Sequence, residues 1–244
     1  NITIVTAFFD IGRSNWTPDK GLPHYLQRTT ETYMERFSHM AQMENEMVVF
    51  SSPDIIDKLI PLRKDKLTRW IPFDFFNEYS NLIQKIHNIH KTDKFQNSIH
   101  PSQRANPEYW NAHYVVVNFL KATFVNIALE RNYVKNELVS WLDFGYCRTP
   151  DKIPQSKKWS YDFDVDKMHL FNYKDYDHRP IPEIISTNDV YILGAKIVGG
   201  NDAWLEFNVL MNQLINEMLY NTMIDDDQTF LLLATIKKPE MFEL

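Results

Sequence analysis

Residues 2–9 of this 244-residue chain read Ile-Thr-Ile-Val-Thr-Ala-Phe-Phe. β-branched and aromatic side chains dominate this run, which predicts a buried strand that ends where Asp10–Arg13 begins. A second short strand is predicted at Met47–Phe50. Between the two strands, apolar residues from Tyr25 to Met43 recur with helical spacing.

Ser52 and Pro53 follow the second predicted strand and suit the N-cap and first turn of a helix that runs to about Leu62. The resulting β-α-β-α order favours an α/β fold with a mixed, mainly parallel sheet flanked by helices. Farther along, we expect these elements: helices over about Phe75–His90 and 111–131, a polar loop over 91–110, strands at Leu138–Phe144 and Val190–Val198, and helices over Asp202–Tyr220 and from Asp225–Asp227 to Ile236.

The bulk composition narrows the class of protein. Hydrophobic residues make up 44% of the chain and aromatic residues 14%, which is enough apolar material for a sizeable core. The formal net charge is −6 and the pI is about 5.8. Because nucleic-acid-binding proteins usually carry a basic face, nucleic acid is disfavoured as a main partner, although a local basic pocket is compatible with these totals.

Cys147 is the single cysteine, so no intramolecular disulfide can form, which fits a reducing cytosol. No apolar run approaches the roughly 20 residues needed to span a bilayer, and no signal peptide is evident. We therefore expect a cytoplasmic protein with at most peripheral contact with the inner face of a membrane, for example through Arg63–Lys66. The oligomeric state cannot be predicted.

Trp141–Tyr146 reads Trp-Leu-Asp-Phe-Gly-Tyr and ends a predicted central strand. In open α/β sheets, ligands bind beyond the carboxyl ends of the strands, where Asp143 would hold a divalent cation that bridges two phosphates. Asp143 followed two residues later by Gly145 is also a common turn pattern, and spacing alone favours the turn.

Asp225, Asp226 and Asp227 stand together at a predicted helix start, where capping and the helix dipole favour negative charge. Capping accounts for one or two of them. Three adjacent carboxylates are costly unless a cation or solvent is near, so a metal ligand, a general base or an acceptor-binding carboxylate would each fit.

Three weaker signals point toward a nucleotide. Arg13, in the loop after the first strand, is suited to phosphate or is an ordinary surface arginine. Lys121 lies on an otherwise apolar helix, where it contacts phosphate or lays its stem along the apolar face. Gly199 and Gly200 join a strand to a helix and allow either close approach of a ligand or a tight turn.

The order of these motifs resembles the HtrL/YibB family of bacterial proteins, whose opening is similar to Ile4–Arg13 and whose middle is similar to Trp141–Tyr146. The stretch from Ile197 through Gln228 completes a resemblance that spans nearly the whole chain. The layout is also similar to GT-A glycosyltransferases, which is an analogy at the level of fold.

The resemblance implies one GT-A-like, Rossmann-type domain over 1–244, with a nucleotide-binding half (1–147) and an acceptor half (148–244) that includes a loop-rich insertion at about 148–182. It implies transfer of a sugar from a nucleotide-diphosphate donor to a glycan or lipid-linked glycan, in bacterial cell-surface polysaccharide synthesis. The implied donor-binding residues are Thr6, Ala7, Phe8, Phe9, Arg13, Lys121, Trp141, Leu142, Gly199 and Gly200.

Asp143 with Mn²⁺ or Mg²⁺ would neutralise the leaving diphosphate. Gly145 stands where an Asp-x-Asp motif has its second carboxylate, so the motif is degenerate. Asp227 would be the general base of an inverting reaction, with Asp226 as the substitute, or would steady the developing positive charge of a retaining one. A nucleotidyltransferase-like enzyme and a non-catalytic relative that binds glycan or protein are the alternatives.

Overall fold

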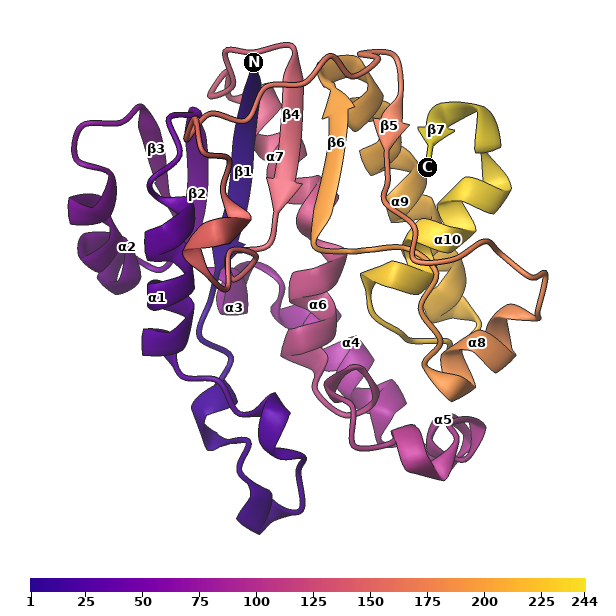
Figure 1. The fold of residues 1–244 in the computed structure, drawn as a ribbon. Coiled ribbons are helices and arrows are strands. Elements are labelled where there is room, and N and C mark those ends of the chain that lie inside the picture. Colours follow the sequence, from indigo (N-terminus) through magenta and orange to yellow (C-terminus); the bar gives the residue numbers. More distant parts are fainter.

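The computed structural model describes all 244 residues and contains one seven-stranded sheet in the order β3-β2-β1-β4-β6-β5-β7 (Figure 1). Its strands are β1 (Ile2–Phe8), β2 (Met47–Ser51), β3 (Thr68–Pro72), β4 (Leu138–Leu142), β5 (Met168–His169), β6 (Lys196–Gly200) and β7 (Phe242–Glu243). Every strand runs in the same direction except β6, which pairs antiparallel with both β4 and β5. The predicted mixed, mainly parallel sheet is therefore confirmed.

Helices cover both faces of the sheet. They are α1 (Thr30–Met40), α2 (Pro53–Leu59), α3 (Phe75–Glu78), α4 (Ser80–His90), α5 (Asp93–Ser98), α6 (Ala112–Phe119), α7 (Lys121–Glu130), α8 (Ile181–Thr187), α9 (Asn201–Tyr220) and α10 (Asp227–Lys237). Alternation along β1 divides the core between the two faces: Ile4 and Phe8 join the cluster under α1 and α2, whereas Val5 and Phe9 join the larger cluster under α6, α7 and α9.

Two predicted helices are broken. The helix expected over Phe75–His90 is interrupted at Tyr79, and the one expected over 111–131 bends by 45° between α6 and α7. The break at Leu120 places Lys121 at the first position of α7, with its side chain buried beneath the sheet edge. No single helix is both long and apolar enough to cross a membrane, and the bent pair α6–α7 meets that test only when the two helices are taken together.

The stretch 91–110, predicted as a loop, contains α5 and two 3₁₀ turns at Pro101–Gln103 and Pro107–Tyr109. Its helix begins at Thr92, whose hydroxyl accepts a hydrogen bond from the Phe95 amide, a capping pattern that its polar composition hid. The strand β3 was also not predicted, because its exposed residues and terminal proline are typical of an edge. The segment 148–182 is mostly irregular, as expected.

Candidate active site

A cavity of about 430 Å³ opens at the carboxyl ends of β1 and β4. From β1 the sheet is built outward through β2 and β3 on one side, and the chain then returns to place β4 on the other side. This reversal of strand order leaves a crevice between neighbouring strand ends, which is where open α/β sheets bind ligands. The cavity is lined by residues that follow both strands, among them Ala7, Phe8, Phe9, Trp141 and Asp143.

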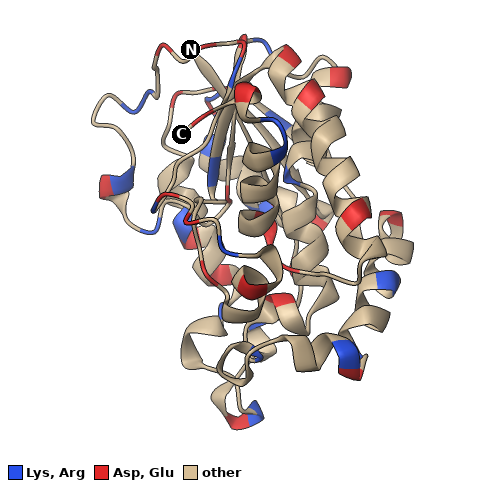
Figure 2. Cartoon of the chain, turned by 90° about the vertical axis from the view of Figure 1, so that its right-hand side faces the viewer, with Lys and Arg blue, Asp and Glu red and all other residues tan.

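The cavity is strongly basic in an acidic protein. Its lining includes six basic side chains, Arg13, Arg28, Arg36, Lys121, Arg148 and Lys152, and two acidic ones, Asp10 and Asp143. In the view of Figure 2, basic and acidic residues are interspersed along the chain. A local excess of positive charge in a cavity favours an anionic ligand.

Lys121 forms the polar floor of this cavity. Its ammonium donates hydrogen bonds to Asp227 Oδ2 at 2.8 Å and to the Gly194 carbonyl at 2.9 Å, and lies 2.9 Å from Asp143 Oδ1. An ammonium has three donors, so all are used. Burial lowers the pKa of Lys121, but the charges of Asp143 and Asp227 outweigh burial and hold this pKa above its usual value.

Asp143 and Asp227 differ in their access to the cavity. The Asp143 side chain is 38% exposed, and its Oδ1 accepts hydrogen bonds from Lys121 and from Trp141 Nε1 at 2.8 Å. Its Oδ2 has no hydrogen-bond partner. The Asp227 side chain is only 7% exposed and lies against Gly194, where an added Cβ would stand 2.1 Å from Asp227 Oδ2. The glycine is what allows Asp227 to reach Lys121.

Gly145 lies close to the aromatic ring of Tyr33. A Cβ placed on Gly145 would be 3.2 Å from two ring carbons of Tyr33 and 3.5 Å from Arg36 Cδ. Phe144, the residue between Asp143 and Gly145, stacks on Phe37 with centroids 4.5 Å apart and turns away into the core under α1. A second carboxylate at position 145 would therefore require the Tyr33 ring to shift.

Arg13 lines the cavity but is largely committed to the protein. Its guanidinium donates to the Leu26 carbonyl through Nε and Nη2 and to the Tyr33 hydroxyl through Nη1. It also lies over the Trp16 ring, 5.1 Å from the centroid. These contacts hold the arm formed by residues 13–28, the indigo segment that projects from the sheet in Figure 1. Arg13 thus fixes the loop that carries Arg28.

A buried acidic cluster of Glu108, Asp225 and Asp226 lies next to Asp227, with ligand atoms of the first three within 4.8 Å of one another. Burial, together with the charges of neighbouring carboxylates, raises the pKa of Glu108 to about 7 and that of Asp225 to about 8. Burial also raises the pKa of Asp226 and of Asp227. These carboxylates can share protons or one cation.

Several residues predicted to contact the donor do not line the cavity. The Thr6 and Leu142 side chains are buried within the sheet. Gly199 and Gly200 lie in β6, whose antiparallel direction carries them to the opposite edge, where Gly200 pairs with Leu138 at the start of β4. They are glycines because added Cβ atoms would stand 2.4 Å from Met168 Sδ and 1.9 Å from the Val165 carbonyl oxygen.

Asp226 and Asp227 also lie outside the lining. Asp226 is the N-cap of α10, since its Oδ1 accepts a hydrogen bond from the Gln228 amide at 3.0 Å. Asp227 reaches the cavity only through Lys121. The capping role predicted for one of the three aspartates is therefore confirmed for Asp226.

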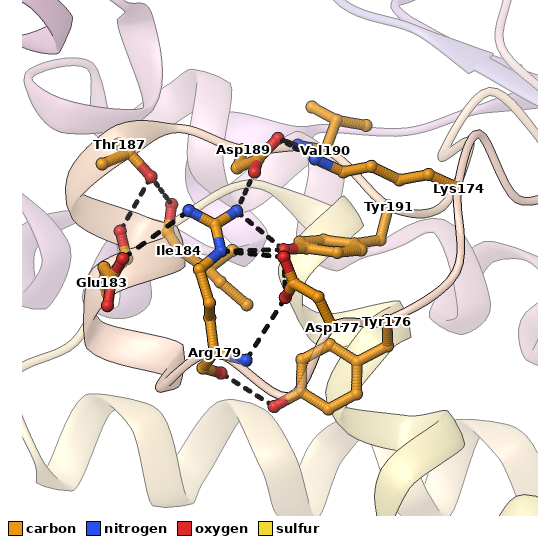
Figure 3. Close-up of polar contacts among 10 residues, drawn as sticks. All are labelled: Lys174, Tyr176, Asp177, Arg179, Glu183, Ile184, Thr187, Asp189, Val190 and Tyr191. Carbon is orange, nitrogen blue, oxygen red and sulfur yellow. Dashed lines mark hydrogen bonds and ion pairs between the residues drawn. The ribbon is translucent and has the colours of Figure 1, made fainter.

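Beyond Lys152, the chain lines the cavity through Leu193 and Ala195, on either side of the Gly194 carbonyl that accepts from Lys121. A polar network precedes this segment (Figure 3). The Tyr191 hydroxyl donates to Asp177 Oδ1 at 2.8 Å and accepts from Arg179 Nη2 at 2.7 Å, while Arg179 also pairs with Asp189. The network connects Asp177 and Arg179 to Asp189 and Tyr191 ahead of β6.

Sequence reasoning missed Arg28, Arg36 and Arg148, although all three line the cavity. Arg36 falls on the polar face of a predicted helix, where a basic residue needs no explanation. Arg148 stands five residues after Asp143. This closeness to the Asp143 motif is the one signal in the sequence that could have identified it as a site residue. Glu108 was hidden in the stretch predicted as a loop.

Comparison with known proteins gives the family. The model for "Bacterial protein of unknown function (HtrL_YibB)" matches residues 1–244. The chain belongs to the HtrL/YibB family. It is 39% identical to the protein HtrL of Escherichia coli (strain K12) over 246 aligned residues, which cover 99% of this chain and 86% of that protein. The resemblance seen in the sequence is confirmed over its whole length.

A solved structure, that of mouse xyloside xylosyltransferase 1 in its apo form, aligns with all of this chain and 84% of its own. The sequence identity is 8% and the TM-score is 0.43. At that level the likeness establishes neither fold nor function, so the functional argument rests on the cavity itself.

The residues at Asp143 do not fit the Mn²⁺ or Mg²⁺ expected there. Lys121 already pairs with both Asp143 and Asp227, and Gly145 supplies no second carboxylate. Two unit charges of like sign about 4 Å apart repel by about 4 kcal/mol at an effective dielectric constant of about 20, and a divalent ion doubles that figure. Glu108, Asp225 and Asp226 are the carboxylates whose spacing can accommodate a cation.

Proposed function

We propose that this chain is a glycosyltransferase that moves a sugar from a nucleoside-diphosphate donor to a hydroxyl of a glycan or lipid-linked glycan. The observation that carries the proposal is the basic cavity at the carboxyl ends of β1 and β4 with the half-exposed Asp143 in its lining. Synthesis of bacterial cell-surface polysaccharide is the setting we propose for it.

The charge of the cavity supports an anionic donor. None of Arg28, Arg36, Arg148 and Lys152 forms an ion pair within the protein, so all four are free to meet phosphate oxygens. Arginine binds phosphate through two parallel hydrogen bonds, and a diphosphate presents several acceptor oxygens to such a set. The aromatic residues Phe8, Phe9 and Trp141 supply apolar surface alongside.

Asp143 is the carboxylate best placed for chemistry. In an inverting reaction, its free Oδ2 would take the proton of the acceptor hydroxyl as that oxygen bonds to the anomeric carbon. The bond between the anomeric carbon and the phosphate oxygen then breaks, and its electron pair leaves with the diphosphate. In a retaining reaction, the same carboxylate would steady the positive charge that develops on the sugar ring.

Asp227, which we expected to be the base, is proposed instead to position Lys121. Its side chain is buried under that ammonium and has no surface in the cavity. Asp226 is occupied as a helix cap. Lys121 can therefore hold Asp143 Oδ1 without any movement of Asp226 or Asp227. Asp143 Oδ2 then stays free for the ligand.

A thermal-shift screen of UDP, GDP, dTDP and CMP sugars tests donor binding, because a ligand that binds only the folded state raises the melting temperature. We expect one diphosphate sugar to stabilise the protein, and Asp143→Asn to abolish donor hydrolysis and transfer while that stabilisation persists. Stabilisation by no nucleotide sugar, or full turnover by Asp143→Asn, would contradict the proposal.

A further inference from the structure

We infer that the nucleotide-sugar donor binds in this cavity without a divalent cation, because the ammonium of Lys121 lies between Asp143 and Asp227 and the free basic residues of the cavity receive the diphosphate. The inference rests on the proposed function and specifies its ionic requirement. Three features of the cavity support it.

The first feature is the balance of charge on the cavity floor. Lys121 has a buried side chain and contacts two carboxylate oxygens at 2.8 and 2.9 Å. Buried charges of this kind persist when they are paired, and this group carries one positive charge between two negative ones. An ion entering at Asp143 would have to displace Lys121 or approach it directly, and both are unfavourable.

The second feature is the set of unpaired arginines. Burial lowers the pKa of Arg36, and the positive charges of Arg28 and Arg148 lower it further. Arg28 and Arg148 therefore each repel Arg36, which has no ion-pair partner to offset the repulsion. A diphosphate would relieve the repulsion and supply acceptors for bidentate hydrogen bonds. The arginines would then neutralise the charge of the leaving diphosphate in place of a divalent ion.

The third feature is the space at Gly145. A Cβ at this position would be 3.2 Å from the ring of Tyr33, so a second carboxylate beside Asp143 would require that ring to shift. With Asp143 Oδ1 occupied by Lys121 and Trp141, only Oδ2 is left without a partner. One carboxylate oxygen is a poor site for Mg²⁺ or Mn²⁺, which need several oxygen ligands.

Isothermal titration calorimetry of the full chain with UDP, GDP, dTDP and ADP tests the inference, with each titration run in EDTA and in MnCl₂. For the nucleoside diphosphate that binds, we expect the dissociation constant to agree within about fivefold between the two conditions, a small difference on the scale of binding free energies. The variant Glu108→Gln removes one carboxylate of the acidic cluster, so a Mn²⁺ effect that persists in it does not arise there.

Substitutions distinguish the contribution of the cavity's basic residues to binding from that of the protein's overall charge. We expect Arg36→Gln and Arg148→Gln each to weaken binding in EDTA by about tenfold, as expected for a lost charge-assisted contact. Lys85→Gln, which removes an exposed lysine of α4 outside the cavity, should leave it unchanged. Lys121→Met, which frees both carboxylates, should show a larger thermal shift with Mn²⁺ than the wild type does.

The outcomes are distinct. Binding that Mn²⁺ strengthens by more than about fivefold in the Glu108→Gln variant overturns the inference and leaves the proposed function standing. Normal binding by both arginine variants also overturns the inference. Binding of no nucleoside diphosphate in either condition overturns the proposed function itself. If Lys121→Met does not fold, the calorimetry and the arginine variants decide.

Discussion

Lys121 and Asp227 are 106 positions apart in the chain, yet their side chains meet at 2.8 Å under the floor of the cavity. The contact joins the first turn of α7 to the first turn of α10. It joins two features that the sequence marked separately as candidate site residues, a lysine on an apolar helix and a run of three aspartates. The pair therefore links the stability of the fold to the geometry of the proposed site.

Lys121→Met should lower the free energy of unfolding by about 3–5 kcal/mol, because removing one partner of a buried ion pair leaves the other charge uncompensated. Urea denaturation at pH 7 measures the change. Lys85→Met is the control, since Lys85 is exposed and forms no ion pair. A loss for Lys121→Met no greater than that of the control would show that Asp227 does not depend on Lys121.

Gly194→Ala should destabilise the protein by about 3 kcal/mol, because the new methyl group would occupy the position of the Asp227 carboxylate and overpacking is costly. Gly194 does not have a positive φ, so its variant tests the steric clash without backbone strain, whereas Gly21→Ala, with a φ of 78° and open space, tests backbone strain without a clash. A Gly194→Ala variant as stable as the wild type would contradict the close approach of Asp227 to Gly194.

The stability of the protein should fall as the pH rises from about 5 to 9. Burial raises the pKa of Glu108 to about 7 and that of Asp225 to about 8 in the folded state, above the values of the unfolded chain. The folded protein then holds protons that the unfolded chain has released, so the stabilisation is complete at acid pH and is lost as the pH passes through these folded-state values.

Urea midpoints measured at pH 5, 7 and 9 with EDTA present test this dependence, and Glu108→Gln should flatten it because glutamine cannot ionise. A midpoint that is constant across the range, or a slope that Glu108→Gln leaves intact, would argue against the buried carboxyl cluster.

Tyr191→Phe should cost about 1–3 kcal/mol, because it removes the hydroxyl that donates to Asp177 and accepts from Arg179 in the network shown in Figure 3, so both of these contacts are lost. Tyr220→Phe controls for the loss of a hydroxyl, since Tyr220 is 87% exposed. Urea denaturation of the two variants gives the difference. If both behave as wild type, the network does not hold the segment before β6.

The sequence predicted most of what depends on local pattern. The strand predicted over residues 2–9 and the capping by one of the three aspartates follow from residue type and spacing, and the structure has them as β1 (Ile2–Phe8) and the N-cap Asp226. The family was also predicted, since the motifs stand in a characteristic order. Asp143 was singled out because a carboxylate at the end of a buried strand is costly without a role.

The parts that could not be predicted depend on contacts between distant segments. Spacing does not reveal that Lys121 meets Gly194 and Asp227, nor that β6 runs against its neighbours and removes Gly199 and Gly200 from the cavity. Gly145 looked like a turn residue or a missing ligand, whereas the ring of Tyr33 explains it. Each of these facts exists only once the chain is folded.

The reversed direction of β6 also bears on how this protein could be re-engineered. The chain passes the cavity at Leu193 and Ala195 before it enters β6, and it leaves that strand at the far edge of the sheet. A mutant library aimed at selectivity should therefore randomise positions that precede β6 and positions that follow β1 and β4. Diversity placed in α9, which follows β6, would alter the scaffold and leave ligand choice unchanged.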